Sequence, residues 1–512
     1  MDSNNAVTYT RVRILGQLEC CSPLHVGDGT EPLFKERVQG VKDAEVRYRA
    51  VCLDHRGKPF IPATTLRGWL RDRLSADPAL ADRLFGHLES TGGVAGKVRV
   101  FDAILMDSGS TDNPKRPYWD TQRATAIQHG IALNPITGTV GDHLLFRHEV
   151  VPPGTRFSLE LTADDLDRGS LAVLLGLLES LNGAPDATIG RGRSRMQGRL
   201  KWTREQVQTL DDQAIAGWLD DADRSLAQAY KALDSVPAAV MPAPRPGYAI
   251  RLRLRPQGPL LINEPGLVSP GAECEHPAPE DAEERHDPDL EFSRTPDGRA
   301  QVPAASLRGV LRGRARRILA TLAAARNPAE APGKIADFLL EGLFGATGRR
   351  GRLWTSDAVA ATPCDGLDQT FVAIDRFTGG GERHKLYRAN AARCGDLLAD
   401  LWLDTRISPD EDPLRGEPAD WEKGLLLLLA RDALEGELAA GWGKARGYGA
   451  LEVELDYAGT RVGAWSAPRG QGLLERIDAS RGRAAAQDWI DALHQKIATV
   501  TPAALPSAAR PR

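Results

Sequence analysis

Two stretches of the chain alternate polar and apolar residues with the period of a half-buried β-strand. They are RVRILGQLECCSPLHVGDG (Arg11–Gly29) and RLRLRPQGPLLINEPG (Arg251–Gly266), and both end in a glycine-containing loop. Each is followed by a phrase with apolar residues at helical spacing, IPATTLRGWLRDRL (Ile61–Leu74) and VPAASLRGVLRGRA (Val302–Ala315). A proline ahead of a Thr or Ser predicts that a capped helix begins in each phrase, with leucines inward and arginines outward.

These paired segments predict an internal duplication. Further landmarks recur in the same order in both halves: LFG (Leu84–Gly86, Leu343–Gly345), a short strand with Asp-Ala (Gly96–Leu105, Gly351–Ala360), LNPITG and IDRFTG (Leu133–Gly138, Ile374–Gly379), and a glycine-rich basic turn (Gly190–Leu200, Gly441–Leu451). The sequence therefore predicts one domain of roughly 200 residues written twice.

The segments between the repeats set the expected domain boundaries. We place the first domain at residues 1–202 and the second at 248–460. Residues 203–247 hold a polar helical stretch (Glu205–Leu233) and a proline-rich linker, VPAAVMPAPRPG. Residues 461–512 form a C-terminal extension with a predicted helix at Arg483–Ala498 and a tail that we expect to be disordered.

The order of elements within each repeat predicts the fold class. Strands and helices follow as strand–helix–strand, twice, and a second, buried helix is predicted at Leu171–Leu181, ending at the C-cap signal Asn182–Gly183. Two such units on one antiparallel sheet form the ferredoxin-like (RRM-like, βαββαβ) arrangement. We therefore expect an α+β chain with two tandem domains of this type, each enlarged by loop insertions.

Composition changes this picture only through the placement of charge. The 512 residues are 42% hydrophobic, and no apolar run approaches the ~18 residues of a membrane span. The N-terminal segment lacks the apolar core of a signal peptide, so we expect a cytoplasmic protein without membrane contact. The net charge of −4 argues against nucleic-acid binding, yet arginines crowd into 191–199, 308–317 and 349–352.

The six cysteines predict reduced, mostly buried thiols, because they are scattered and no CxxC spacing occurs. The one metal-like cluster is Cys274–His276 with His286, in a loop rich in Pro and Glu. Whether any cysteine binds zinc stays open, and no metal ligand is assigned.

The quoted motifs together resemble those of the RAMP superfamily, the repeat-associated proteins of CRISPR systems. The resemblance rests on PLHVGDG, the IPATTLRGWLR phrase, LFG, HEVVPPGTRFSLEL (His148–Leu161) and the Gly-Arg turn, and it covers nearly the whole chain except the linker, the long inserts and the tail. It is specifically similar to backbone subunits of type III, III-D-like, effector complexes, here with two RAMP domains fused.

The resemblance implies a function and partners. Such subunits assemble with other effector-complex subunits along a CRISPR RNA, and a thumb-like hairpin kinks this guide. The segments around LNPITG and IDRFTG resemble that thumb insertion, with Thr137 and Thr378 near the kinked nucleotide. A loop Asp then cuts the paired target RNA with a divalent metal, Mg or Mn, so an endoribonuclease activity is implied.

Two surfaces are candidates for RNA contact on chemical grounds. Free amides, a hydroxyl and outward arginines at a helix start suit phosphate, and glycines let a backbone approach a ligand while Arg and Lys supply charge. Trp442 and Tyr448 could stack on a base. The helix candidates are Thr65, Arg67, Arg71, Ser306, Arg308 and Arg312, and the turn candidates are Gly190, Arg191, Gly192, Arg193, Arg195, Gly441, Gly443, Lys444 and Arg446.

The resemblance places the catalytic Asp about fifteen residues before the Pro-initiated helix. Asp289 lies 14 residues and Asp287 16 residues before Pro303, whereas the first repeat offers only Asp43 or Glu45 near that spacing. A carboxylate there could position a metal-bound water or the 2′-hydroxyl. Two alternatives stay open: a structural guide-binding subunit without catalysis, and a guide-processing ribonuclease with His25 as general base. The number of nuclease sites, the stoichiometry and the subtype also stay open.

Overall fold

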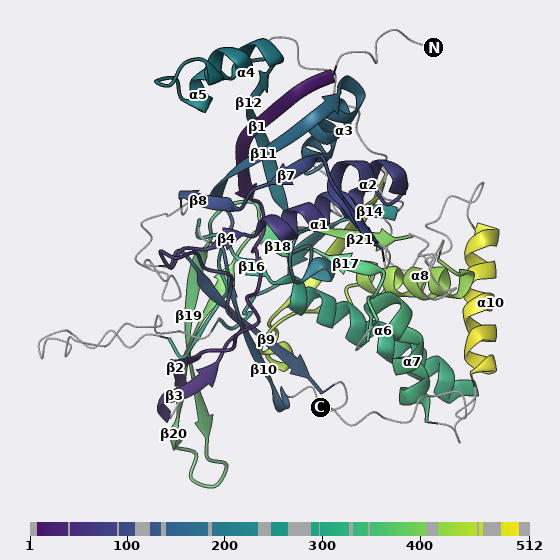
Figure 1. Ribbon diagram of the computed structural model, residues 1–512. Coiled ribbons are helices and arrows are strands. Elements are labelled where there is room, and N and C mark those ends of the chain that lie inside the picture. The colour runs from purple at the N-terminus through teal and green to yellow at the C-terminus, as the bar shows by residue number, and fades with distance from the viewer. Residues whose placement is uncertain are drawn as a thin grey trace, which may run out of the picture.

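A computed structural model describes residues 8–38, 41–89, 92–107, 123–134, 140–182, 187–233, 247–264, 288–295, 297–326, 331–346, 349–405, 418–457, 460–463 and 483–500. Each repeat builds an antiparallel sheet with helices packed on it, and long hairpins leave the body (Figure 1). The mixture of helices and antiparallel sheets makes the chain an α+β protein.

The sheet of the first repeat runs in the order β13-β12-β1-β11-β8-β4, with β7 also paired to β11. Its central strand β1 alternates as expected, and Val12, Ile14 and Leu18 face the core. The strands are β1 (Thr8–Cys20), β4 (Phe60–Ile61), β7 (Val98–Val100), β8 (Ala103–Asp107), β11 (Arg156–Asp167), β12 (Leu200–Leu210) and β13 (Lys231–Ala232).

Helices cover this sheet with apolar faces that follow the 3.6-residue period. Helix α1 buries Leu66, Trp69 and Leu70, and α3 is buried along most of its length, as its sequence predicts. The helices of this half are α1 (Ala63–Arg73), α2 (Pro78–Phe85), α3 (Arg168–Glu179), α4 (Asp212–Leu219) and α5 (Leu226–Ala229).

The second repeat has the same strand order around its central strand, β16-β18-β21-β14-β23-β22, with β17 on β21 and β24 on β23. Its strands are β14 (Gly247–Pro256), β16 (Gln301–Val302), β17 (Leu353–Thr355), β18 (Ala358–Ala360), β21 (Leu397–Asp404), β22 (Leu438–Ala439), β23 (Ala450–Tyr457) and β24 (Thr460–Gly463). Its helices are α6 (Ala304–Arg326), α7 (Pro332–Phe344), α8 (Asp420–Leu434) and α10 (Arg483–Thr499). Because β12-β1-β11-β8 and β23-β14-β21-β18 correspond, the sequence duplication is also a duplication of topology.

Hairpins outside the two sheets are the main additions to each repeat. The longest, β19–β20, projects from the body at the lower left of Figure 1, and β15 pairs in parallel with its second strand. The added strands are β2 (Leu33–Val38), β3 (Val41–Arg47), β5 (Gly86–Glu89), β6 (Gly92–Ala95), β9 (Ala126–Leu133), β10 (Val140–Val150), β15 (Leu290–Glu291), β19 (Asp365–Ile374) and β20 (Gly381–Arg393).

The two repeats meet at the glycine-rich turn of the first. Met196, which is 1% exposed, forms a small apolar cluster with Trp354 and Trp402 of the second repeat. Near this cluster Arg199 forms an ion pair of 3.7 Å with Asp400. The turn that the sequence assigns to RNA therefore also joins the repeats.

Several local predictions need correction. The stretch Glu205–Leu233 is not one helix, because β12 continues to Leu210 and two short helices and β13 follow. No Thr or Ser side chain caps α1, whose N-cap position is Pro62. The C-terminal helix lies where it was predicted, whereas the proline-rich linker and the tail lie outside the described residues.

Among the helices that the structure describes, none is long and apolar enough to cross a membrane.

Candidate RNA-binding surface

The N-terminus of the first helix in each repeat is occupied by a carboxylate. The Ala63 N–H donates to Asp102 Oδ1 at 2.7 Å, and the Ala304 N–H donates to Asp357 Oδ1 at 2.6 Å. Each Asp comes from the Asp-Ala pair that both repeats share, on the loop ahead of β8 or β18. A capping carboxylate satisfies an orphan amide and the helix dipole. The prediction that these amides are free for phosphate is therefore wrong for Ala63 and Ala304.

The arginines of the same helices bind backbone carbonyls. Arg67 donates to the Phe85 carbonyl, and Arg308 donates to the Phe344 carbonyl at 2.6 Å and to the Leu353 carbonyl. Phe85 and Phe344 end α2 and α7, whose last carbonyls have no partner inside the helix. The same device thus recurs in both repeats. Arg67 is exposed on α1, as predicted, whereas Arg308 is half-buried, so the prediction that Arg308 faces outward is wrong.

The remaining helix candidates differ in how far they are bonded to the rest of the protein. Arg71 donates to the Gly86 carbonyl and pairs with Asp82, so it is also tied to α2. Arg312 is exposed on α6, one turn beyond Arg308. Thr65 and Ser306 are half-buried in the first turn of their helices. Of these residues, Arg312 is therefore the one most available to an RNA.

The glycine-rich turn of the first repeat needs glycine for close packing. Gly190 has φ +79°, and a Cβ there would lie 2.3 Å from the His25 carbonyl oxygen. Gly192, with φ +83°, precedes the 3₁₀ turn Arg193–Arg195. The Arg191 N–H donates to the His25 carbonyl, so the turn that carries Arg191 is held against the PLHVGDG segment. This geometry agrees with the expected close backbone approach, but the approach is made to the protein's own chain.

Five arginines from both repeats converge where this turn meets α6, and we call them the inter-repeat arginine track. Burial, Arg312 and Arg195 lower the pKa of Arg308 to about 10. Burial and Arg191 lower the pKa of Arg195, while Asp357 acts against them, and burial and Arg49 lower that of Arg191. Like charges this close repel one another, and Glu31, which pairs with Arg49, and Asp357 offset only part of the charge, so the track keeps an excess of positive charge across the joint. Its members are Arg49, Arg191, Arg195, Arg308 and Arg312.

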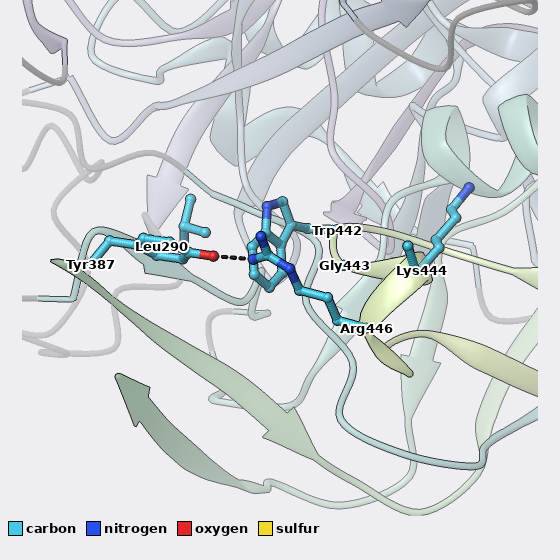
Figure 2. Close-up of a pocket in the computed structure, with 7 residues that line it drawn as sticks. Leu290, Tyr387, Trp442, Gly443, Lys444 and Arg446 are labelled. Atoms are coloured by element: carbon cyan, nitrogen blue, oxygen red, sulfur yellow. Dashed lines mark hydrogen bonds between the residues drawn. The ribbon is translucent and has the colours of Figure 1, made fainter. Parts of the chain in front are cut away.

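The corresponding turn of the second repeat lines an open hollow, which we call the aromatic–basic pocket. It has a volume of about 500 Å³ and is lined by Leu290, Tyr387, Trp442, Gly443, Lys444, Ala445 and Arg446. Figure 2 shows Arg446 lying between the Trp442 ring and Tyr387, with Lys444 pointing away from them. Gly441 and Gly443 have φ of +85° and +74°, as the glycine-rich motif predicts.

Arg446 is held in this pocket by aromatic rings. Its guanidinium lies 5.0 Å from the Trp442 ring centroid and 5.8 Å from that of Tyr387, and it donates to the Tyr387 hydroxyl. Trp442 is half-buried, whereas Tyr448 is 4% exposed and donates to Gln369. Trp442 thus keeps a partly open ring, and the expectation that Tyr448 stacks on a base is wrong because its ring is in the core.

The model of the RAMP superfamily matches residues 17–201 and 253–452 of this sequence. The chain belongs to the RAMP superfamily. The two matches fall on the two structural repeats, so two RAMP domains are fused in one polypeptide. Membership makes it a CRISPR-associated RNA-binding protein that works with CRISPR RNA and effector-complex subunits. No curated protein matches the chain.

The candidate acids of this RAMP protein lie in different settings. Asp289 is exposed, accepts a hydrogen bond of 2.8 Å from the Arg388 N–H and directly precedes Leu290, which lines the aromatic–basic pocket. Asp43 lies on strand β3 rather than in an open loop. Asp287 lies outside the described residues. The structure therefore brings one candidate, Asp289, to the edge of a basic surface.

His25, the candidate general base of the RAMP alternative, is a buried residue. It is 5% exposed, and its Nδ1 lies 2.6 Å from the Glu149 carbonyl oxygen. Burial lowers its pKa, and burial with Arg195 and Arg191 lowers that of His148 to about 3. The two rings lie 5.8 Å apart. Neutral imidazoles packed beside arginines expose little surface to a substrate.

The hairpin turn at IDRFTG is well defined in the second RAMP domain. The Asp375 carboxylate accepts from the Phe377 and Thr378 N–H groups, and Phe377 is fully exposed at the tip. In the first domain Asn134 directly follows β9, while Thr137 lies outside the described residues.

No three His, Cys, Asp or Glu side chains in the described ranges cluster closely enough to hold a metal ion. Cys274, His276 and His286 lie outside those ranges. Within the part that the structure describes, Asp289 offers one carboxylate for a divalent ion. This fits Mg²⁺, which typically binds through one or two carboxylates plus RNA phosphates and water.

Reasoning from the sequence missed the residues that organise both surfaces. The Asp-Ala pairs stood out as repeats, and their recurrence in the same order after the helix phrase in both repeats was the available signal for Asp102 and Asp357. Met196, Trp354 and Trp402 carried no signal, because each occurs in one repeat alone.

Proposed function

We propose that this chain is a guide-RNA-binding backbone subunit of a type III, III-D-like, effector complex. The observation that carries the proposal is the inter-repeat arginine track, in which Arg191 and Arg195 of one domain meet Arg308 and Arg312 of the other. The cost of holding these charges together is relieved by a polyanion, and a sugar-phosphate chain laid across the joint supplies one.

The rest of the architecture supports the same proposal. The order β12-β1-β11-β8 is the order expected of a ferredoxin-like palm, and the second domain repeats it. Lys444 and Arg446 supply a second cationic site at the far turn, beside the half-open Trp442 ring. Phosphate contacts of this kind fix the register of an RNA and read no sequence, which suits a guide of varying sequence.

The test of RNA binding uses the two exposed members of the track. Arg191→Ala with Arg312→Ala should retain the fold and lose most of the RNA that co-purifies with the wild-type chain. The matched control is Arg204→Ala with Arg317→Ala, which removes two other exposed arginines, one of them on the same helix as Arg312. Equal loss of RNA in both double variants would show that the charge total, and not the track, holds the RNA.

We further propose that Asp289 takes part in cutting a target RNA paired with the guide. The supporting observation is its exposed position at the edge of the aromatic–basic pocket. The residue that would hold a divalent Mg or Mn ion is Asp289, and such an ion would supply a water of lowered pKa or an electrophile for the phosphate. The chain's own contribution is to hold the carboxylate, through Arg388, beside a cationic surface.

The cleavage test follows labelled target RNA on a gel, with Mg or Mn, in an assembled complex. Asp289→Ala should remove one cut and leave guide binding unchanged, and Asp289→Asn should behave alike because it keeps the shape and loses the charge. Asp43→Ala serves as the comparison in the first domain. If every cut survives Asp289→Ala, Asp287→Ala and Asp43→Ala alike, the chain is a structural guide-binding subunit. Guide processing by His25, the remaining alternative, predicts cleavage that persists in EDTA and stops in His25→Ala.

A further inference from the structure

Two cysteines of the second domain lie opposite one another at the base of the β19–β20 hairpin. The antiparallel register pairs Asp365 with Arg393, and Cys364 and Cys394 are the next residues outward on the two sides. Both are free thiols, half-buried, and packed against the core of the second domain. Opposite residues on paired strands have their side chains on one face, so the two sulfur atoms point the same way.

The hydrogen bonds of β20 show whether Cys364 and Cys394 form a hydrogen-bonded or a non-hydrogen-bonded antiparallel pair. The Ala392 N–H and carbonyl both bond to Leu260, on the side away from β19. Arg393 is therefore the residue that faces β19 with its polar backbone groups, and Cys394 faces away again, as Ala392 does. By this alternation Cys364 and Cys394 occupy a non-hydrogen-bonded position, where Cα atoms approach to about 4.5 Å. A disulfide needs a Cα separation of about 4.4–6.8 Å.

The two thiols are also close enough to affect one another's ionisation. Burial, with the neighbouring Cys364 thiol adding to it, raises the pKa of Cys394 to about 12. Burial raises the pKa of Cys20, Cys21 and Cys52 too, but among the described residues only this pair is aligned across two strands.

We propose that Cys364 and Cys394 are a modification site that forms an intramolecular disulfide with a disulfide oxidant such as glutathione disulfide. One cysteine thiolate attacks the oxidant, forming a mixed disulfide and releasing one glutathione. The second cysteine displaces the other glutathione. Two protein S–H bonds and the oxidant's S–S bond break, the protein S–S bond forms, and both protons leave as glutathione thiols.

The new bond would close a ring that contains the whole β19–β20 hairpin. That ring includes Tyr387, which lines the aromatic–basic pocket, and Arg388, which holds Asp289. The hairpin joins the domain near Cys364 and Cys394, so a cross-link there limits fraying at its base and stabilises the folded state by restricting the unfolded chain. The proposal stands on this hairpin's geometry and is independent of RNA binding.

The experiment treats the full-length chain with glutathione disulfide in mildly alkaline buffer, where a thiol of raised pKa reacts faster. We expect the chain to lose two of its six thiols, and the peptides containing Cys364 and Cys394 to be joined under non-reducing conditions. The thermal midpoint should rise on oxidation, and dithiothreitol should reverse this rise. Hydrogen exchange at the base of the hairpin should slow in the oxidised form.

The controls separate this bond from other thiol chemistry. Cys364→Ser and Cys394→Ser should each abolish the joined peptide and the rise in thermal midpoint, whereas Cys52→Ser should keep both. A wild-type chain that carries glutathione on either cysteine without a cross-link would overturn the proposal. So would the same rise in thermal midpoint in Cys364→Ser.

Discussion

Met196 of the first domain packs against Trp354 of the second, so the turn that carries Arg191, Arg193 and Arg195 is a joint as well as a basic surface. Met196 itself has a left-handed backbone conformation (φ +48°), which is energetically unfavourable for a residue with a side chain. This conformation directs its side chain to the other domain. The arginines beside it are consequently fixed relative to α6, which is what lets two domains share one phosphate-binding zone.

Met196→Ala should weaken this joint. Removing a buried thioether side chain costs about 2 kcal/mol or more, and because the contact lies between domains we expect calorimetric unfolding to separate into two transitions. Met106→Ala, in an exposed position on β8, is the matched control and should leave the trace almost unchanged. A single transition with the same small shift in both variants would mean that the domains are coupled elsewhere.

Asp357→Ala should lower stability and strengthen RNA binding. Loss of the carboxylate that accepts from the Ala304 N–H removes a cap worth about 1 kcal/mol. It also removes the negative charge that offsets Arg195, so the positive potential of the track increases. Chemical denaturation and RNA titration measure the two effects separately. Weaker RNA binding in a folded variant would contradict this view of the track.

Lys444→Ala with Arg446→Ala should reduce the salt dependence of RNA binding. Each phosphate contact to a single strand adds about 0.7 to the slope of log affinity against log salt, so loss of two contacts lowers its magnitude by about 1.4. Arg251→Ala with Lys231→Ala, which removes charges paired to Asp400 and Asp211, is the control. An unchanged slope in the first variant would remove the aromatic–basic pocket from the RNA path.

Stability should fall as the pH drops below about 6.5. The pKa of His148 is near 3 in the folded chain against 6.5 for an ordinary histidine, so between those values the unfolded chain binds the additional proton. The expected loss is up to about 1.4 kcal/mol per pH unit for this residue. Burial keeps the ring neutral, and the nearby Arg195, Arg191, His25 and Arg49 add to the effect.

His148→Asn should flatten this part of the profile, measured as denaturation free energy from pH 7 to pH 5. His494→Asn, on α10 and paired with Arg326, should leave the slope as it is in the wild type. The same slope in all three chains would place the responsible proton elsewhere.

The sequence was informative where a pattern is local and repeated. The period of Leu66, Trp69 and Leu70 predicts α1, and alternation predicts β1, because both patterns reflect neighbours a few residues apart. The placement of the Pro-initiated phrases, the glycine-rich turns and the apolar helix α3 followed from the same signals.

Contacts between segments far apart in the sequence could not be predicted from the sequence. Ala63 and Asp102 are 39 residues apart and Arg308 and Phe344 are 36 apart, and a capped helix end gives no clue to the partner that caps it. Periodicity predicts that such an arginine is exposed, because it shows on which helix face the residue lies. It does not show which carbonyl the long side chain reaches. Helix and sheet periodicity likewise do not predict the contact that Met196 makes between the domains.

The positions that form the apolar joint are occupied by different residues at the equivalent places of the other repeat. Arg99 stands three residues before Asp102 as Trp354 stands three before Asp357, and it pairs with Thr162 where Trp354 pairs with Trp402. In the second turn Gly447 takes the place of Met196. A contact of three side chains is too small to hold separate proteins together, but a peptide tether raises the local concentration of one domain near the other to about millimolar. Within one polypeptide this seam can therefore be small, and the order of the two domains is fixed by translation instead of by recognition.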